Sequence, residues 1–137
     1  LLIGSTDAVF EVDLKKNTLH KHSHPALVMA EKIYADARNN YWIAAQSRGI
    51  FRFDTISRHL QYYDLNADTR SFLGDADKQI LFEDSHQNFW VGIYGGGLFL
   101  YQNEENYFRQ YTYSETQNAS LSSNQVLSLF EDNSKIE

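Results

Sequence analysis

Short apolar runs separated by polar turn residues recur along the whole chain. Runs of four to eight residues, rich in aromatic and β-branched side chains and bounded by Gly, Asn, Asp or Ser, are typical of β-strands. The run Leu98–Tyr101 is apolar at every position, which predicts a strand covered on both faces by neighbouring sheets. The clearest set of predicted strands is Ile80–Glu83, Phe89–Ile93, Leu98–Tyr101 and Tyr107–Tyr111.

The same pattern occurs in two closely similar copies that lie 48 residues apart. The segment Asp36–Phe53 matches Asp84–Tyr101, and a degenerate third copy at the start of the chain lacks the tryptophan. A fixed period between 20 and 50 residues indicates a repeat architecture. The matched pairs include Asp36 and Asp84, Asn40 and Asn88, Trp42 and Trp90, Gly49 and Gly97, Leu60 and Phe108, Tyr63 and Tyr111, and Leu73 and Leu121, while Leu81–Asp84 matches Leu129–Asp132.

A repeat of four short strands with a tryptophan in the second strand predicts a β-propeller blade. We therefore predict an all-β fold of about three four-stranded blades, as a fragment of a larger propeller for which we expect seven blades. The expected blades are residues 1–31 (partial), 32–78 and 79–125, with the start of a further blade at 126–137. Trp42 and Trp90 should pack between blades, where a large ring buries most area. A helical turn is expected only around Asp68–Asp77.

The connections carry turn residues at repeated places. Asp84 can accept a hydrogen bond from the backbone two residues on, and Asn88 tolerates a positive φ angle; Asp36 and Asn40 repeat the pair. The last glycine of Gly95-Gly96-Gly97 has its counterpart in Gly49, which predicts a positive φ at both positions. Gly92–Gly97 does not predict a dinucleotide site, because a strand and not a helix follows it.

Composition narrows the classes of function. The net charge of −6 and the pI near 5.3 argue against a nucleic-acid partner and against an acidic membrane surface. The absence of cysteine excludes disulfides, thiolate catalysis and Cys-ligated zinc. No apolar run approaches the length of a membrane-spanning helix, so direct membrane insertion is not expected.

Two groups of residues offer candidate chemistry, and for both we favour a structural role. Glu83-Asp84 and Glu131-Asp132 could supply paired carboxylates for acid–base catalysis, but they recur in each blade at a turn. His20, His22 and His24 alternate, so an extended strand would place them on one face, as a metal site could require. We expect no metal ligands, because the equivalent positions in the next repeat are ordinary outer-strand positions.

The better candidates for ligand binding are residues on one rim that do not repeat. If the strands of each blade run in order from the inside to the outside, the loops between second and third strands emerge on the same face as the long polar loops between repeats. Aromatic and hydrogen-bonding side chains gathered there would suit a neutral oligosaccharide. The rim candidates are Gln46, Arg48 and Tyr94, beside Ser47.

The segments VLSLFED, NFWVGIYGGGLFLY and FRQY, with a loop ending in SLSSN, resemble the two-component regulator propeller repeat. The third copy is the most similar, whereas the second has Ala44-Ala45 in place of the usual Gly-Thr. The resemblance implies a periplasmic sensor region of a hybrid two-component protein of the Bacteroidetes type. In that family such blades recognise glycan breakdown products and signal through a membrane helix to a histidine kinase.

The sequence thus predicts a binding and signalling module without catalytic residues or a cofactor, in a periplasmic location. The expected partners are an oligosaccharide and either the remaining blades of a larger propeller or further copies that associate through open blade edges. One alternative is a propeller that binds proteins, which would show an exposed apolar patch on the rim. A second alternative is a propeller enzyme that acts on polysaccharide, with His, Tyr or Arg converging on the centre of the disc.

Overall fold

The computed structural model describes residues 1–46, 49–65 and 79–132 of the chain. Within these ranges the protein is all-β: eleven strands are present and no helix. The helical turn expected around Asp68–Asp77 and the rim candidate Arg48 lie outside the described residues. The strands are β1 (Leu2–Gly4), β2 (Val9–Asp13), β3 (Thr18–His22), β4 (Ala30–Ala35), β5 (Asn40–Ala45), β6 (Gly49–Asp54), β7 (His59–Asp64), β8 (Gln79–Glu83), β9 (Phe89–Ile93), β10 (Gly97–Gln102) and β11 (Tyr107–Tyr111).

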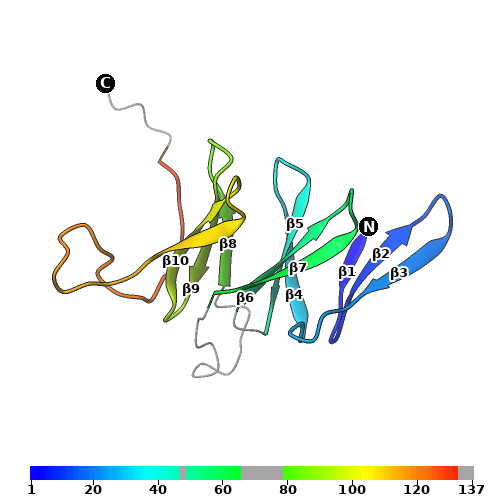
Figure 1. The fold of residues 1–137 in the computed structure, drawn as a ribbon, viewed down its shortest axis with the longest axis horizontal. Coiled ribbons are helices and arrows are strands. Elements are labelled where there is room, and N and C mark those ends of the chain that lie inside the picture. The colour runs from blue at the N-terminus through cyan, green and yellow to red at the C-terminus, as the bar shows by residue number, and fades with distance from the viewer. Residues whose placement is uncertain (47–48, 66–78, 133–137) are drawn as a thin grey trace.

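The strands form three antiparallel sheets, in which each strand pairs with its neighbours in sequence. We call them blade 1 (β1–β3), blade 2 (β4–β7) and blade 3 (β8–β11). Figure 1 shows the three sheets side by side in a row, with blade 2 in the middle. The prediction of an all-β fold built from blades like those of a propeller is therefore confirmed.

The position of blade 2 between two other sheets explains why β5 and β6 carry apolar side chains on both of their faces. Successive side chains of a strand point to opposite faces of the sheet. Trp42 of β5 belongs to the core between blades 2 and 3, whereas Ile43 belongs to the core between blades 1 and 2. In the same way, β6 directs Ile50 toward blade 3 and Phe51 toward blade 1. A sheet between two others needs apolar side chains on both faces.

The two tryptophans differ in their surroundings. Trp42 is completely buried and stacks on Phe89 of blade 3, with ring centroids 4.3 Å apart and planes inclined by 9°. This confirms the predicted packing between blades. Trp90 is only half-buried, contrary to the expectation, because no sheet of the described residues lies against its outer face. It instead lines a cavity beside β10 and β11.

The repeated Asp of each blade organises the turn before the second strand. Asp84 Oδ1 accepts hydrogen bonds from the backbone of His86 (3.0 Å) and Asn88 (2.9 Å), and its Oδ2 accepts from the Trp90 indole at 3.0 Å. Asp36 makes the same set of bonds, including one from the Trp42 indole at 2.9 Å. The motif Asp-x₃-Asn-x-Trp is thus one hydrogen-bonded unit.

Asn40 and Asn88 do not adopt the positive φ that an asparagine tolerates. The left-handed residues are those just before them, Asn39 and Gln87, each with φ of 62°. Asn88 instead donates its side-chain amide to Asp84 Oδ2 at 2.8 Å. The asparagine is therefore needed for its side chain, and the backbone reversal falls on its neighbour.

Both matched glycines lie against the backbone of the next strand, and a Cβ atom on Gly97 would lie 2.5 Å from the carbonyl oxygen of Tyr111 in β11. Gly97 has the predicted positive φ, at 89°. A Cβ atom on Gly49 would lie 1.8 Å from the carbonyl oxygen of Tyr63 in β7. At Gly49 the close approach of β6 and β7 by itself requires the glycine.

Glu83 and Glu131 each accept hydrogen bonds from the turn of the preceding blade. Both carboxylate oxygens of Glu83 accept from the backbone N–H of Ala37, at 3.1 and 3.0 Å, in the turn of the preceding blade. Glu131 accepts from the backbone and hydroxyl of Ser85, at 2.7 and 2.6 Å. Both glutamates act as acceptors for turns 46 residues away, which supports the structural interpretation of the Glu-Asp pairs.

A second set of polar contacts joins β6 and β7 of blade 2 to β10 and the β10–β11 turn of blade 3. Arg52 donates to the hydroxyl of Tyr101 at 2.6 Å, and its guanidinium lies 6.0 Å from the ring centre of Trp42. Tyr63 donates to Asn106 Oδ1 at 2.6 Å. Burial, and then the hydrogen bond with Tyr101, raises the pKa of the Tyr63 hydroxyl. The hydroxyl therefore stays protonated and acts as a donor.

Candidate ligand-binding site

The rim predicted from the sequence exists as a set of converging loops. The β9–β10 connection meets the segment that follows blade 3, through a bridge between Tyr94 and Gln125 and a hydrogen bond from Gly97 N to Asn124 O of 3.0 Å. In blade 2, Gln46 N donates to Val28 O at 2.8 Å. Loops between second and third strands and segments between blades therefore share one edge of the sheets.

The rim candidates lie at equivalent places in successive blades. Gln46 is half-buried, and its amide donates to Glu31 Oε1 at 2.8 Å. Tyr94 is also half-buried, next to the bridge with Gln125. Nothing in the structure tests whether these side chains bind a ligand, so their role stays a prediction.

The loop 112–125 is held by its own hydrogen bonds, and we call it the rim loop. Ser120 Oγ donates to Ser114 O at 3.0 Å and accepts from Ser114 N at 3.1 Å. Asn124 Oδ1 accepts from Tyr113 N at 2.7 Å. Short polar side chains that bond to the backbone in this way fix the shape of a loop without an apolar core.

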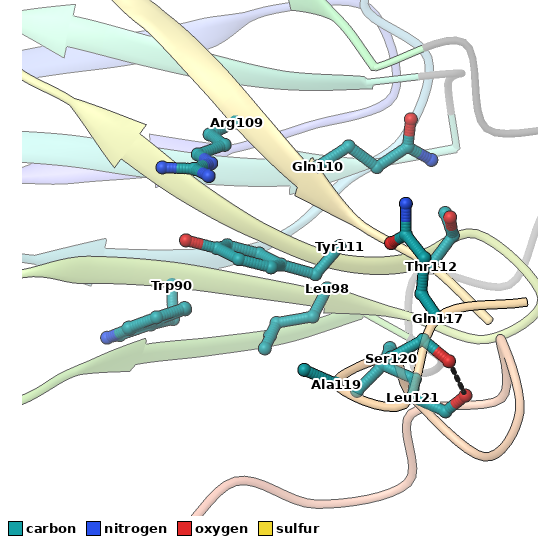
Figure 2. A pocket seen from close by; sticks show the side chains of 10 residues that line it. All are labelled: Trp90, Leu98, Arg109, Gln110, Tyr111, Thr112, Gln117, Ala119, Ser120 and Leu121. Carbon is teal, nitrogen blue, oxygen red and sulfur yellow. Dashed lines mark hydrogen bonds between the residues drawn. The ribbon is translucent and has the colours of Figure 1, made fainter. Parts of the chain in front are cut away.

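A cavity of about 570 Å³ lies between the rim loop and the outer face of blade 3 (Figure 2). Its sheet wall carries mainly aromatic and apolar side chains, and its loop wall carries neutral polar side chains beside Ala119 and Leu121. The cavity is large enough for a small organic ligand. The lining residues from blade 3 are Trp90, Leu98, Arg109, Gln110 and Tyr111, and those after it are Thr112, Gln117, Ala119, Ser120 and Leu121.

The electrostatics of the cavity suit an uncharged ligand. Arg109 is its one charged lining residue among those described, and its guanidinium lies 5.4 Å from the ring centre of Tyr111. A cation over an aromatic face is partly neutralised by the ring. Gln110 donates to Gly96 O at 3.0 Å, which ties β11 to the β9–β10 connection. The remaining polar groups are amides and hydroxyls, which donate and accept hydrogen bonds without net charge.

The histidines lie on the other side of the molecule, at the interface of blades 1 and 2. His22 Nε2 is 3.3 Å from Glu11 Oε2, and the His22 ring lies 4.6 Å from that of Phe53. His24 Nδ1 accepts a hydrogen bond from Ala26 N at 3.1 Å. His20 is exposed. In the part of the chain that the structure describes, no three His, Cys, Asp or Glu side chains gather as metal ligands would.

The sequence pointed to the rim loop as a polar set but did not single out Arg109, Tyr111, Gln117 or Ser120. The sequence identified Tyr111 only as the repeat equivalent of Tyr63, and Tyr63 is buried between blades. That equivalence did not indicate a ligand-binding role. Gln117 and Ser120 lie in a loop whose sequence differs between the two repeats. The repeat pattern therefore did not predict that they share a cavity with Trp90. The fold of the rim loop brings them there.

The chain matches no model of a known protein family, and no curated protein is significantly similar to it. Among the residues that the structure describes, no helix is long and apolar enough to cross a membrane.

Proposed function

We propose that the chain is a ligand-sensing segment of a β-propeller that binds a neutral oligosaccharide at the rim beside blade 3. The supporting observation is the cavity between the rim loop and β11, where Gln110 of β11 and Thr112, Gln117 and Ser120 of the rim loop offer amide and hydroxyl groups. Amide and hydroxyl groups can bond to sugar hydroxyls in both directions. In this proposal Tyr94 and Gln46 extend the same rim, while Arg48 remains a candidate from the sequence alone.

We propose a signalling context for this binding, and the support is the resemblance of the repeat segments to the two-component regulator propeller. The proposal follows that resemblance: a periplasmic sensor region of a hybrid two-component protein, with any kinase activity located elsewhere in the polypeptide. The sensor segment itself would carry out no catalysis and would need no cofactor. It would change the arrangement of blades or rim loops when sugar binds.

Binding to glycans is tested by isothermal titration calorimetry with a panel of plant and host oligosaccharides. We expect one class to bind, with an affinity that changes less than about twofold between low and high salt, because neutral sugars release no counterions. Gln117→Ala should weaken binding at least tenfold through lost hydrogen bonds. The matched control is Gln102→Ala, at the end of β10 and away from the rim cavity.

A panel in which no glycan binds would refute the carbohydrate proposal. Binding of a peptide or protein instead would favour the interaction module as the function. If a glycan binds and Gln117→Ala has no effect, the function stands and the site is misplaced.

A further inference from the structure

A cleft of about 200 Å³ lies between the β4–β5 turn of blade 2 and the β8–β9 turn of blade 3, next to the end of β10. Because consecutive strands are antiparallel, these turns lie at the end of the sheets opposite to the rim (Figure 1). Both walls belong to four-stranded sheets. The cleft is therefore formed by the interface of blades 2 and 3 itself, and we call it the turn cleft.

Two asparagines of the repeated turn motif line the turn cleft with amides of fixed orientation. Asn40 Nδ2 donates to Asp36 Oδ2 at 2.9 Å. Asn88 Nδ2 donates to Asp84 Oδ2 at 2.8 Å. Each bond leaves the Oδ1 atom of the same amide as an acceptor that makes no hydrogen bond with another described residue.

Three further carboxamides, those of Gln87, Gln102 and Asn103, line the turn cleft from blade 3. None of these three side chains makes a hydrogen bond within the described part of the chain. Each offers two N–H donors and one carbonyl oxygen. The turn cleft thus gathers donors and acceptors that the protein itself does not use.

Gln102 departs from the role that the repeat gives to its position. The equivalent residues in blades 1 and 2 are Asp13 and Asp54, which end β2 and β6. Asp13 Oδ1 accepts hydrogen bonds from two backbone N–H groups of its turn, at 2.9 and 3.2 Å, and Asp54 Oδ1 does the same at 2.7 and 3.1 Å. Gln102 makes no such bond with the described residues.

The turn of blade 3 keeps its shape without that cap. Its left-handed residue is Asn106, with φ of 55°, and the corresponding residues of blades 1 and 2 are Asn17 and Arg58, with φ of 52° and 57°. An aspartate at position 102 would therefore find the same turn to cap. Because the hairpin does not require the glutamine, its amide is available to a partner outside the chain.

The electrostatics of the turn cleft favour an uncharged ligand. Asp36 and Arg38 are its charged lining residues among those described, and their charges cancel. Asp36 already accepts from the backbone of Arg38 at 2.9 Å and from the Trp42 indole at 2.9 Å. Glu104 and Glu105, in the adjoining β10–β11 turn, would repel an anion.

The aromatic rings of the turn cleft offer no free face for stacking. Phe89 is 3% exposed and stacks on Trp42, and Tyr101 is 8% exposed. The Tyr101 hydroxyl accepts from Arg52 at 2.6 Å and donates to Asn106 Oδ1 at 3.0 Å. Sugar rings and nucleobases gain much of their affinity by stacking on an exposed aromatic ring. A ligand that binds by hydrogen bonds alone therefore fits this lining better.

We propose that the turn cleft binds an uncharged, extended peptide segment of a partner through its main chain. An extended residue presents its N–H and C=O on the same side of the chain. One carboxamide can accept from the first group and donate to the second. The volume of the cleft equals that of about seven water molecules, so it admits a short stretch of main chain and no folded domain. This site is separate from the rim and does not rest on the proposed binding of sugar.

Proton–nitrogen NMR correlation spectra of the full chain give the first test, with the neutral peptide acetyl-Gly-Ala-Gly-amide as the probe. We expect the side-chain amide signals of Gln87, Gln102 and Asn103 to shift and to saturate at millimolar peptide. The ligand control is the analogue in which an ester oxygen replaces the alanine N–H. It lacks one donor and should bind at least about fivefold more weakly.

The second test restores the residue that the repeat predicts. Gln102→Asp should cap its turn as Asp54 does, and should weaken peptide binding at least tenfold, because a carboxylate donates no hydrogen bond. Its melting temperature should equal or exceed that of the original protein, so that lost binding does not report unfolding. Asn103→Ala, at an exposed position, should weaken binding at least threefold. Glu104→Gln, in the same turn but outside the lining, is the matched control and should bind like the original protein.

Side-chain amide signals that stay in place at millimolar peptide would overturn the proposal. Equal binding of the peptide and its ester analogue, or undiminished binding in both Gln102→Asp and Asn103→Ala, would do the same. Glucose that shifts these signals in place of the peptide would show a sugar site and also overturn it. Loss of peptide binding but not glycan binding in Gln102→Asp, with the reverse in Gln117→Ala, would separate this site from the rim.

Discussion

The indole of Trp42 lies flat on the phenyl ring of Phe89, with ring centroids 4.3 Å apart, and this contact joins two blades. The two residues come from equivalent strands of successive blades, β5 and β9. Trp90, one repeat later, makes the same hydrogen bond to its turn aspartate but has no ring stacked on its outer face among the described residues. The local hydrogen-bonded motif is therefore the same in both blades. The burial of the two tryptophans differs because a neighbouring sheet covers only Trp42.

Trp42→Ala should lower the free energy of unfolding by about 3–5 kcal/mol, because it empties a fully buried site between sheets. His20→Ala, at an exposed position, should cost less than about 0.5 kcal/mol. Trp90→Ala, at a half-buried position, should fall between them. Urea denaturation at low protein concentration measures all three. Equal effects for Trp42 and His20 would contradict the packing described here.

Glu83→Ala should destabilise the protein by about 1 kcal/mol, because it leaves the N–H of Ala37 without the carboxylate that links blades 2 and 3. Glu105→Ala, in the exposed β10–β11 turn, is the control and should have little effect. Hydrogen exchange of the Ala37 amide gives a local measure. Unchanged protection of that amide in Glu83→Ala would show that the contact does not hold the turn.

Asp84 should contribute to stability in a pH-dependent way. Partial burial raises the pKa of its carboxyl, but hydrogen bonds from Trp90 and Asn88 outweigh this, so the pKa is lower than in the unfolded chain. The stabilisation is therefore complete above the unfolded pKa of about 3.9 and is lost as the pH falls through the folded value. Asp84→Asn should lower stability at pH 7 and flatten the decline toward pH 3, as measured by urea unfolding. Glu104→Gln should leave the profile unchanged; a decline as steep in Asp84→Asn as in the original protein would count against this account.

Gly49→Ala should destabilise the protein by about 1–3 kcal/mol, because the new Cβ would meet the backbone carbonyl of Tyr63 and the strands would have to separate. Gly96→Ala is the control, at a half-buried glycine outside the left-handed region. Thermal melts followed by circular dichroism give the comparison. If both substitutions are equally mild, the close approach of β6 and β7 at this position is not required.

The sequence by itself determined the repeat, the strands and the alternation of side chains within them. The spacing of Trp42 and Trp90, the apolar run Leu98–Tyr101 and the turn aspartates are local patterns, and local backbone preferences repeat wherever the pattern repeats. The packing of Trp42 between sheets was predictable for the same reason. So was the positive φ of Gly97.

Only the tertiary structure decided which residues meet across blades. Glu83 binds a turn 46 residues away, Gly49 is required by the carbonyl of another strand, and Gln117 lines the same cavity as Trp90. None of these relations has a local signal, because each depends on how two sheets or a loop and a sheet are placed in space. The exposure of Trp90 is the clearest case: its sequence motif is that of Trp42, and the burial of a side chain depends on which sheet lies against it.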